Sequence, residues 1–264
     1  MNLPPLTWLY VPADRPDRVE KAIASRAHAV IVDLEDGVAP SAKAAARDGL
    51  EALLGEQRDK PVLVRVNAGD AADLDAVEGL PIAGVVLPKV ARPTDVRAIG
   101  LPVYCLIESA AGVEAAFEIA SIPAVAGISL GEADLRSETG ALESGLDWTR
   151  SRIVNAAVAA GLPRPPQSVY PHVNDPEGLA RSCVRGRSLG HLGRAAIHPA
   201  QLEIIERAYL PTNDEVARAR ETVARPQLAL GASALPGGEM VDAAMLGAAR
   251  QVVALAEQYG TAPA

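Results

Sequence analysis

Short apolar runs alternate along the chain with alanine-rich amphipathic segments. The apolar runs have the length of strands buried on both faces, and the segments between them have helical periodicity. The pattern predicts strands at residues 8–13, 29–34, 61–67, 84–90, 103–107, 125–130, 167–173 and 194–197. It predicts helices or helical turns at residues 16–26, 41–54, 74–80, 93–99, 112–121, 147–160, 176–189 and 200–209.

Eight strand–helix repeats fit a closed TIM (β/α)8 barrel, which we expect over residues 1–210. An open doubly wound sheet is the alternative, but no G-x-G-x-x-G follows the first strand. Residues 211–264 do not continue the repeat and predict a C-terminal helical extension, with helices at 212–223 and 239–258. Such an extension packs on its own barrel or crosses to a neighbouring subunit.

The segment from Val103 to Leu135 forms one βαβ unit in this scheme. Its first strand ends in Glu108, and its second breaks into a loop that contains Asp134. Adjacent parallel strands bring these two carboxylates to one edge of the sheet, where they form a site for a hard divalent cation, Mg²⁺ first of all. The alternative is that each acid only caps the helix after its strand.

Nearly every predicted strand ends in a polar group, and two of these groups are cations within apolar runs, Arg65 and Lys89. Burying a long cation costs several kcal/mol unless an anion meets it. One interpretation is an internal ring of ion pairs with Glu35, Asp36 and Glu108. The interpretation that we favour is a metal site facing cations that hold a carboxylate or an enolate.

Other reactive side chains give weaker signals. His198, before Pro199, is as compatible with a structural role as with a catalytic one, and four histidines make a histidine-based metal site improbable. No serine or cysteine has a base beside it in the sequence. A late basic stretch predicts a solvated helix face, part of which could hold phosphates: Arg181, Arg185, Arg187 and Arg194.

Composition narrows the class of protein. Apolar residues make up 49% of the 264 residues and aromatic residues only 3%, as in a parallel sheet covered by helices. The net charge of −8 gives no basic field for nucleic acid or a membrane surface. Cys105 and Cys183 predict neither zinc nor a disulfide framework, and the context of Cys105 predicts a buried thiol. Without a signal peptide or a spanning segment, we expect a soluble cytoplasmic protein.

Eight motifs occur in the order and spacing of one family: LYVPADRP, VDLEDGV, VRVNA, LPK, IESAAG, GEADL, AIHPAQ and GGEMVD. Over residues 9–255 the chain resembles the citrate lyase β-subunit-like (CitE-like) branch of the HpcH/HpaI aldolase/citrate lyase superfamily. The resemblance implies a TIM barrel of the phosphoenolpyruvate/pyruvate type. It also implies a Mg²⁺-dependent lyase that cleaves or forms a carbon–carbon bond beside a CoA thioester.

Roles carried over by this resemblance fall on matching positions. Glu108 and Asp134 match the metal ligands, in agreement with the strand-end argument. The expected catalytic residues are Arg65, which faces the reacting carbonyl oxygen, Glu35 and Asp36 behind the metal waters, and Asp242 reaching a neighbour's site. The expected substrate-binding residues are Arg15, Arg65, Lys89, Glu132 and Pro199.

The chain departs from the family pattern at two positions. The family often reads Gly-Ala-Glu-Asp-Leu where this chain has the acid one place earlier, at Glu132, so that this side chain is expected to point elsewhere. The lysine common before AIHP is Arg194, which leaves a phosphate contact there open.

The resemblance leaves several functions open. The substrate is a CoA thioester such as citryl-CoA or malyl-CoA, or a carrier-bound acyl group. The alternatives are an aldolase acting on free hydroxy-oxo-acids, and a citrate lyase β-subunit active only with an acyl-carrier partner. A homotrimer or hexamer is expected.

Overall fold

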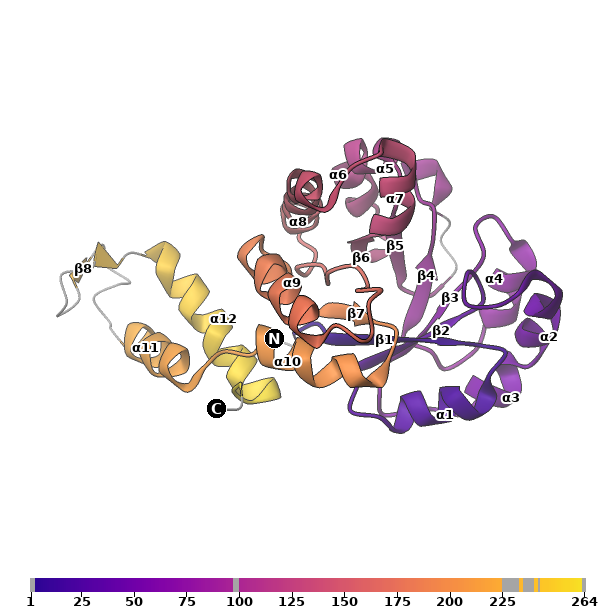
Figure 1. The fold of residues 1–264 in the computed structure, drawn as a ribbon, viewed down its shortest axis with the longest axis horizontal. Coiled ribbons are helices and arrows are strands. Elements are labelled where there is room, and N and C mark those ends of the chain that lie inside the picture. Colours follow the sequence, from indigo (N-terminus) through magenta and orange to yellow (C-terminus); the bar gives the residue numbers. More distant parts are fainter. Residues whose placement is uncertain (1–2, 97–99, 225–232, 235–239, 242, 263–264) are drawn as a thin grey trace. The chain divides into compact units, whose positions relative to one another are not determined.

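The computed structural model describes residues 3–96, 100–224, 233–234, 240–241 and 243–262. The chain divides into two compact units (Figure 1). The first is Pro4–Ile205, which contains the large sheet. The second joins Leu3 to the residues from Glu206 onward. The predicted catalytic residue Asp242 lies outside the described residues.

The first unit is built on a curled half-barrel of seven parallel strands. The strands lie in the order β6-β5-β4-β3-β2-β1-β7, so that each chain neighbour from β1 to β6 is also a neighbour in the sheet. Their Val-, Ile- and Leu-rich sequences suit a sheet buried on both faces. The strands are β1 (Thr7–Pro12), β2 (Ala29–Asp33), β3 (Val62–Arg65), β4 (Gly84–Leu87), β5 (Val103–Ile107), β6 (Val125–Leu130) and β7 (Arg194–Ala196).

The predicted strand at 167–173 is wrong. In the described part of the chain, Gln167 makes a single parallel bridge with Arg194, and no ladder joins this segment to β6. Pro165 and Pro166 precede this segment and Pro171 lies within it, and a proline has no backbone N–H to donate to a ladder. Eight repeats predicted a closed barrel, but the sheet of the described residues is a half-barrel.

Helices follow most strands, in agreement with the periodicity. They are α1 (Pro16–Ala24), α2 (Lys43–Asp48), α3 (Leu50–Leu54), α4 (Ala71–Val77), α5 (Ala110–Glu114), α6 (Ala116–Ala120), α7 (Glu132–Thr139), α8 (Asp147–Ala159), α9 (Pro176–Ser188) and α10 (Leu202–Tyr209). Short 3₁₀ turns are η1 (Pro40–Ala42), η2 (Pro93–Asp95), η3 (Glu143–Leu146) and η4 (Pro199–Gln201). Helix α7 is absent from the sequence prediction, because Leu135 is its single buried residue and the pattern carries almost no apolar stripe.

Two apolar clusters hold the sheet in place. On one face, Trp8, Ile31, Leu63 and Val86 pack with Tyr104, whose ring centroid lies 5.7 Å from that of Trp8. On the other face, β5 and β6 pack against α5, α6 and α8 through residues that include the buried Cys105. The prediction of a buried thiol at Cys105 is confirmed, and burial raises the pKa of that thiol to about 12.

The second unit contains α11 (Asn213–Val223) and α12 (Ala243–Tyr259), with a short antiparallel pair, β8 (Ser233–Ala234) and β9 (Met240–Val241). Thr212 caps α11 by accepting the N–H of Glu215 at 3.2 Å. Gln258 of α12 accepts the Leu3 N–H at 2.9 Å. No helix of the described residues is both long and apolar enough to cross a bilayer.

Candidate active site

Arg65 is fixed at the end of β3 by an acid on the neighbouring strand. The register pairs Asp33 of β2 with Arg65. Arg65 Nε and Nη2 lie 2.7 Å from the two different carboxylate oxygens of Asp33. The Arg65 guanidinium also lies 5.0 Å from the Tyr10 ring centroid. Burial lowers the pKa of Arg65, but the hydrogen bonds and charge of Asp33 outweigh it and leave the pKa raised. The guanidinium is therefore a permanent, oriented cation.

The loop after β2 holds the acids predicted to be catalytic. Asp33 accepts the N–H of Glu35 at 2.9 Å and that of Gly37 at 2.8 Å. Glu35 is 4% exposed, and its Oε2 lies 3.0 Å from Arg65 Nη1. The Asp36 side chain is 67% exposed, with an oxygen 3.9 Å from the same nitrogen. One buried carboxylate thus orients both the arginine and the acidic loop.

Lys89 links two of the acids. Its backbone is left-handed, with φ of 58°, a conformation that costs energy for a residue with a Cβ. In this conformation its N–H donates to Glu108 Oε1 at 2.6 Å, and its Nζ lies 3.1 Å from Glu35 Oε1. The ammonium is half exposed, and the hydrogen bond and charge of Glu35 raise its pKa.

Glu108 follows β5 and is 8% exposed. Its pKa is raised to about 7, chiefly by burial and also by Glu35 and Asp134, against the Lys89 hydrogen bond and the charge of Arg65. Strands β5 and β6 pair Ile107 with Leu130, which sets Gly131 beside Glu108. A Cβ at Gly131 would lie 2.5 Å from Glu108 Oε2, so this corner admits only glycine without a shift.

Asp134 lies in the first turn of α7 and is exposed. Its charge adds to the raised pKa of Glu108, of which burial is the largest cause. Glu35, Glu108 and Asp134 together form an acidic group whose mutual repulsion a divalent cation would relieve. In the described part of the chain, no three His, Cys, Asp or Glu side chains converge on one metal position. The two carboxylates of Glu108 and Asp134 fit Mg²⁺, because this ion commonly binds one or two protein carboxylates and completes its coordination shell with water and substrate oxygens.

The contacts described for the remaining predicted residues are with other groups than this cluster. Arg15 is exposed after β1, and its Nε lies 4.0 Å from Asp14 Oδ1. Pro199 is exposed at the start of η4, which His198 caps by accepting the Ala200 N–H at 3.2 Å. The capping contact gives His198 a structural function. Glu132 is engaged by Arg150, so its predicted contact with substrate stays a prediction.

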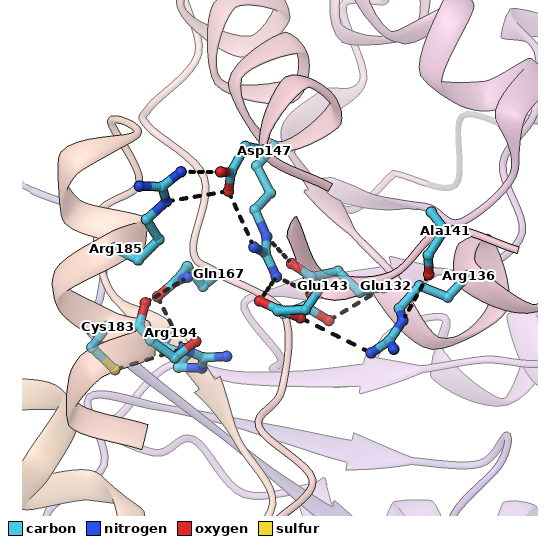
Figure 2. A network of polar contacts seen from close by, with 12 residues as sticks. Glu132, Arg136, Ala141, Glu143, Asp147, Gln167, Cys183, Arg185 and Arg194 are labelled. Atoms are coloured by element: carbon cyan, nitrogen blue, oxygen red, sulfur yellow. Dashed lines mark hydrogen bonds and ion pairs between the residues drawn. The ribbon is translucent and has the colours of Figure 1, made fainter. Parts of the chain in front are cut away.

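Sequence reasoning missed Asp33 and Arg150. Asp33 had a signal, since it is a charged residue inside an apolar strand one place before the expected strand end. Arg150 had none, because its partner Glu132 lies 18 residues earlier. The late basic stretch was predicted to be a solvated helix face, but Arg194 is buried. It is 2% exposed and donates to Gln167 and Ser182 at 3.0 and 2.9 Å (Figure 2).

Known sequences resemble this chain over most of its length. The sequence profile described as HpcH/HpaI aldolase/citrate lyase matches residues 6–199. A citrate lyase subunit beta-like protein of Mycobacterium tuberculosis is 36% identical over 258 residues, covering 90% of this chain and 91% of its own. A (3S)-malyl-CoA thioesterase of Cereibacter sphaeroides is 34% identical over 271 residues, covering 94% and 93%.

A solved structure agrees in fold over almost the whole chain. It is the crystal structure of CitE from Mycobacterium tuberculosis in complex with magnesium, acetoacetate and coenzyme A. It superposes with a TM-score of 0.83 at 34% identity, covering 95% of this chain and 97% of that one. Together with the profile match, these likenesses confirm the predicted resemblance: the chain belongs to the HpcH/HpaI aldolase/citrate lyase family, in its citrate lyase β-subunit-like branch.

Proposed function

We propose that the protein is a Mg²⁺-dependent carbon–carbon lyase that cleaves or forms a 3-hydroxyacyl-CoA such as citryl-CoA or malyl-CoA. The observation that carries the proposal is a buried guanidinium, Arg65, which Asp33 orients and whose charge acts on the buried carboxylate of Glu108. The family adds support, because the Mycobacterium tuberculosis relative was crystallised with magnesium and coenzyme A.

In this proposal, Glu108 and Asp134 hold the metal. Burial, with smaller contributions from the charges of Glu35 and Asp134, raises the pKa of Glu108, and a bound cation would favour its charged form; two carboxylates fit the donor set of a hard cation. When bound, Mg²⁺ supplies Lewis-acid polarisation of the substrate carboxylate and its adjacent oxygen. Asp36, exposed beside Glu35, is proposed to hydrogen-bond the waters behind that ion.

Arg65 stabilises the enolate oxygen of the acyl thioester. Asp33 occupies its Nε and Nη2, which leaves Nη1 as the nitrogen facing Glu35. A donor that is oriented before the reaction stabilises developing negative charge without reorganising. The half-exposed Lys89 ammonium, with Arg15 and Pro199 after β1 and β7, is proposed to contact the rest of the substrate.

A carboxylate moves the proton. In the cleavage direction it takes the substrate hydroxyl proton, the carbon–carbon bond breaks, and the electron pair becomes the acyl thioester enolate as the oxo-acid forms. Return of the proton to carbon gives acyl-CoA, and the reverse sequence condenses acyl-CoA with an oxo-acid. Glu35 is the candidate within this chain, since burial raises its pKa against the pull of Arg65. Asp242 of a neighbouring subunit is the other.

We also propose that the sheet closes into the family's TIM (β/α)8 barrel, with residues 167–173 in place of the missing strand. The support is the bridge between Gln167 and Arg194, together with the Glu132 N–H that lies 3.4 Å from Ser168 Oγ. A homotrimer or hexamer, with residues 211–264 packing on a neighbouring subunit, would bring Asp242 to the next active site.

A thioesterase is the second candidate, favoured by the 34% identity to the (3S)-malyl-CoA thioesterase. The deciding experiment is a screen of 3-hydroxyacyl-CoA thioesters with Mg²⁺, read out in parallel as released oxo-acid and as free CoA thiol. The lyase releases oxo-acid and keeps the thioester, whereas hydrolysis releases thiol without oxo-acid. Turnover of free hydroxy-oxo-acids without CoA would favour an aldolase, and activity only with an acyl-carrier protein would favour a citrate lyase subunit.

A further inference from the structure

An ion-pair network centred on a buried arginine joins α8 to α7, the helix that carries the proposed metal ligand Asp134 (Figure 2). Its centre is Arg150 of α8, whose side chain is 3% exposed. Arg150 Nε and Nη2 lie 2.8 and 2.6 Å from the two oxygens of Glu132, the first residue of α7. Nη2 also donates to Glu143 at 2.7 Å, and Nη1 to Asp147 at 3.4 Å.

Helix geometry connects Glu132 to the proposed metal ligand. Asp134 follows two residues later in the same first turn. At 3.6 residues per turn, two positions are separated by about 200° around the helix axis, so these two side chains leave opposite sides of α7. Fixing Glu132 against α8 therefore fixes the direction in which Asp134 leaves the helix.

Helix α7 is also anchored in its second half, where Glu138 accepts the Ala110 N–H at 2.8 Å, but its first turn has few other anchors. The helix is 8 residues long, Leu135 is its single buried residue, and its N-cap Gly131 supplies no side-chain hydrogen bond. Helices this short are not stable by themselves in water. A second contact at its start is weak, with the Glu132 N–H 3.4 Å from Ser168 Oγ. The bidentate pair with Arg150 is consequently the strongest interaction that sets the rotation of the first turn.

We propose that Arg150 is a positioning residue that acts through Glu132 to aim Asp134 at the metal position, an inference that rests on the metal site of the proposed function. Glu132, which lies one position earlier than the acid of the family pattern, then has a role of its own, because it orients the metal ligand Asp134 without touching the metal. Groups that orient metal ligands from outside the coordination shell typically change metal affinity by about 10- to 100-fold when removed.

Metal affinity measured apart from turnover tests this inference. Mn²⁺ is the probe, since carboxylate sites for Mg²⁺ also take Mn²⁺, and its free concentration is read by electron paramagnetic resonance. The variants are Arg150→Met, Glu132→Gln and Asp134→Asn in the full chain. The matched control is Arg185→Met, which removes an arginine from the same network that pairs with Asp147 and not with α7. Circular dichroism checks that each variant is folded.

We expect Arg150→Met to weaken Mn²⁺ binding about tenfold or more, Glu132→Gln to weaken it less, and Arg185→Met to leave it within about twofold of wild type. Equal weakening in Arg185→Met would overturn the inference, because the effect would then be general to the network. Unchanged affinity in folded Arg150→Met and Glu132→Gln, with binding lost in Asp134→Asn, would overturn it while sparing the metal site. Unchanged affinity in Asp134→Asn would remove the metal site itself. If Arg150→Met does not fold, Glu132→Gln decides.

Discussion

Replacing Asp33 by asparagine is the sharpest test of how the active-site arginine is held. The Asp33 side chain is 5% exposed, and its carboxylate accepts two hydrogen bonds from Arg65, one from the Glu35 N–H and one from the Gly37 N–H. An asparagine side chain would have the same shape, but one of its two acceptor positions becomes an NH₂ group that faces one arginine donor and one backbone donor. The substitution also leaves the Arg65 guanidinium without its closest negative charge.

The expected magnitude follows from those contacts. Breaking a buried ion pair by removing one partner costs about 3–5 kcal/mol in the free energy of unfolding. For a chain of this size, such a loss lowers the melting temperature by roughly 6–20 °C. Because Arg65 keeps its charge but loses its orientation, kcat should fall by about 10²- to 10³-fold, as for removal of one oxyanion donor.

Denaturant unfolding and steady-state kinetics with a CoA thioester measure the two effects separately. Arg58→Met is the matched control, since Arg58 pairs with Glu20 at 3.0 Å between α1 and the loop after α3, away from Arg65. The reasoning would be refuted by an Asp33→Asn variant whose stability and kcat both stay within experimental error of wild type. Loss of stability with unchanged kcat would refute only the role assigned to the orientation of Arg65.

Three further outcomes are expected. Burial lowers the pKa of His191 to about 4, so the unfolded chain takes up a proton at higher pH than the folded chain. The free energy of unfolding should therefore fall by about 3 kcal/mol as pH drops from 6.5 to 4, and this fall should be shallower in His191→Gln. Asp134→Ala should abolish lyase activity with an unchanged circular dichroism spectrum; turnover retained after chelation would contradict the metal assignment. Gly131→Ala should lower stability by about 1–3 kcal/mol in thermal unfolding, because its Cβ would lie 2.5 Å from Glu108 Oε2.

Of the two interpretations of the cations at the strand ends, the structure shows the ion pairs, and the metal site remains a proposal. Arg65 and Lys89 are both paired with Glu35, at 3.0 and 3.1 Å, as an internal ring of ion pairs would require. Glu108 is a further buried acid at this edge, and burial, more than the charges of Glu35 and Asp134, raises its pKa to about 7. An arrangement that served stability alone would not need an excess of buried acid.

The sequence by itself determined most of the sheet. Buried parallel strands read as continuous apolar runs, and seven of the eight predicted strands are present within a few residues of their expected ends. The placing of Glu108 after β5 also followed from the sequence, since a charged residue that ends an apolar run marks the end of a strand. These features depend on local composition, which the sequence displays directly.

Only the tertiary structure decided how the charges are partnered and where the sheet stops. Asp33 meets Arg65 because two strands share a register although these residues are 32 positions apart, and Arg150 of α8 meets Glu132 of α7 across 18 positions. The segment after Pro165 looked like a strand, yet it forms a single bridge, because hydrogen bonding to a neighbour is a property of two segments. Local pattern fixes which residues are buried, whereas the identity of each partner depends on the packing of distant segments.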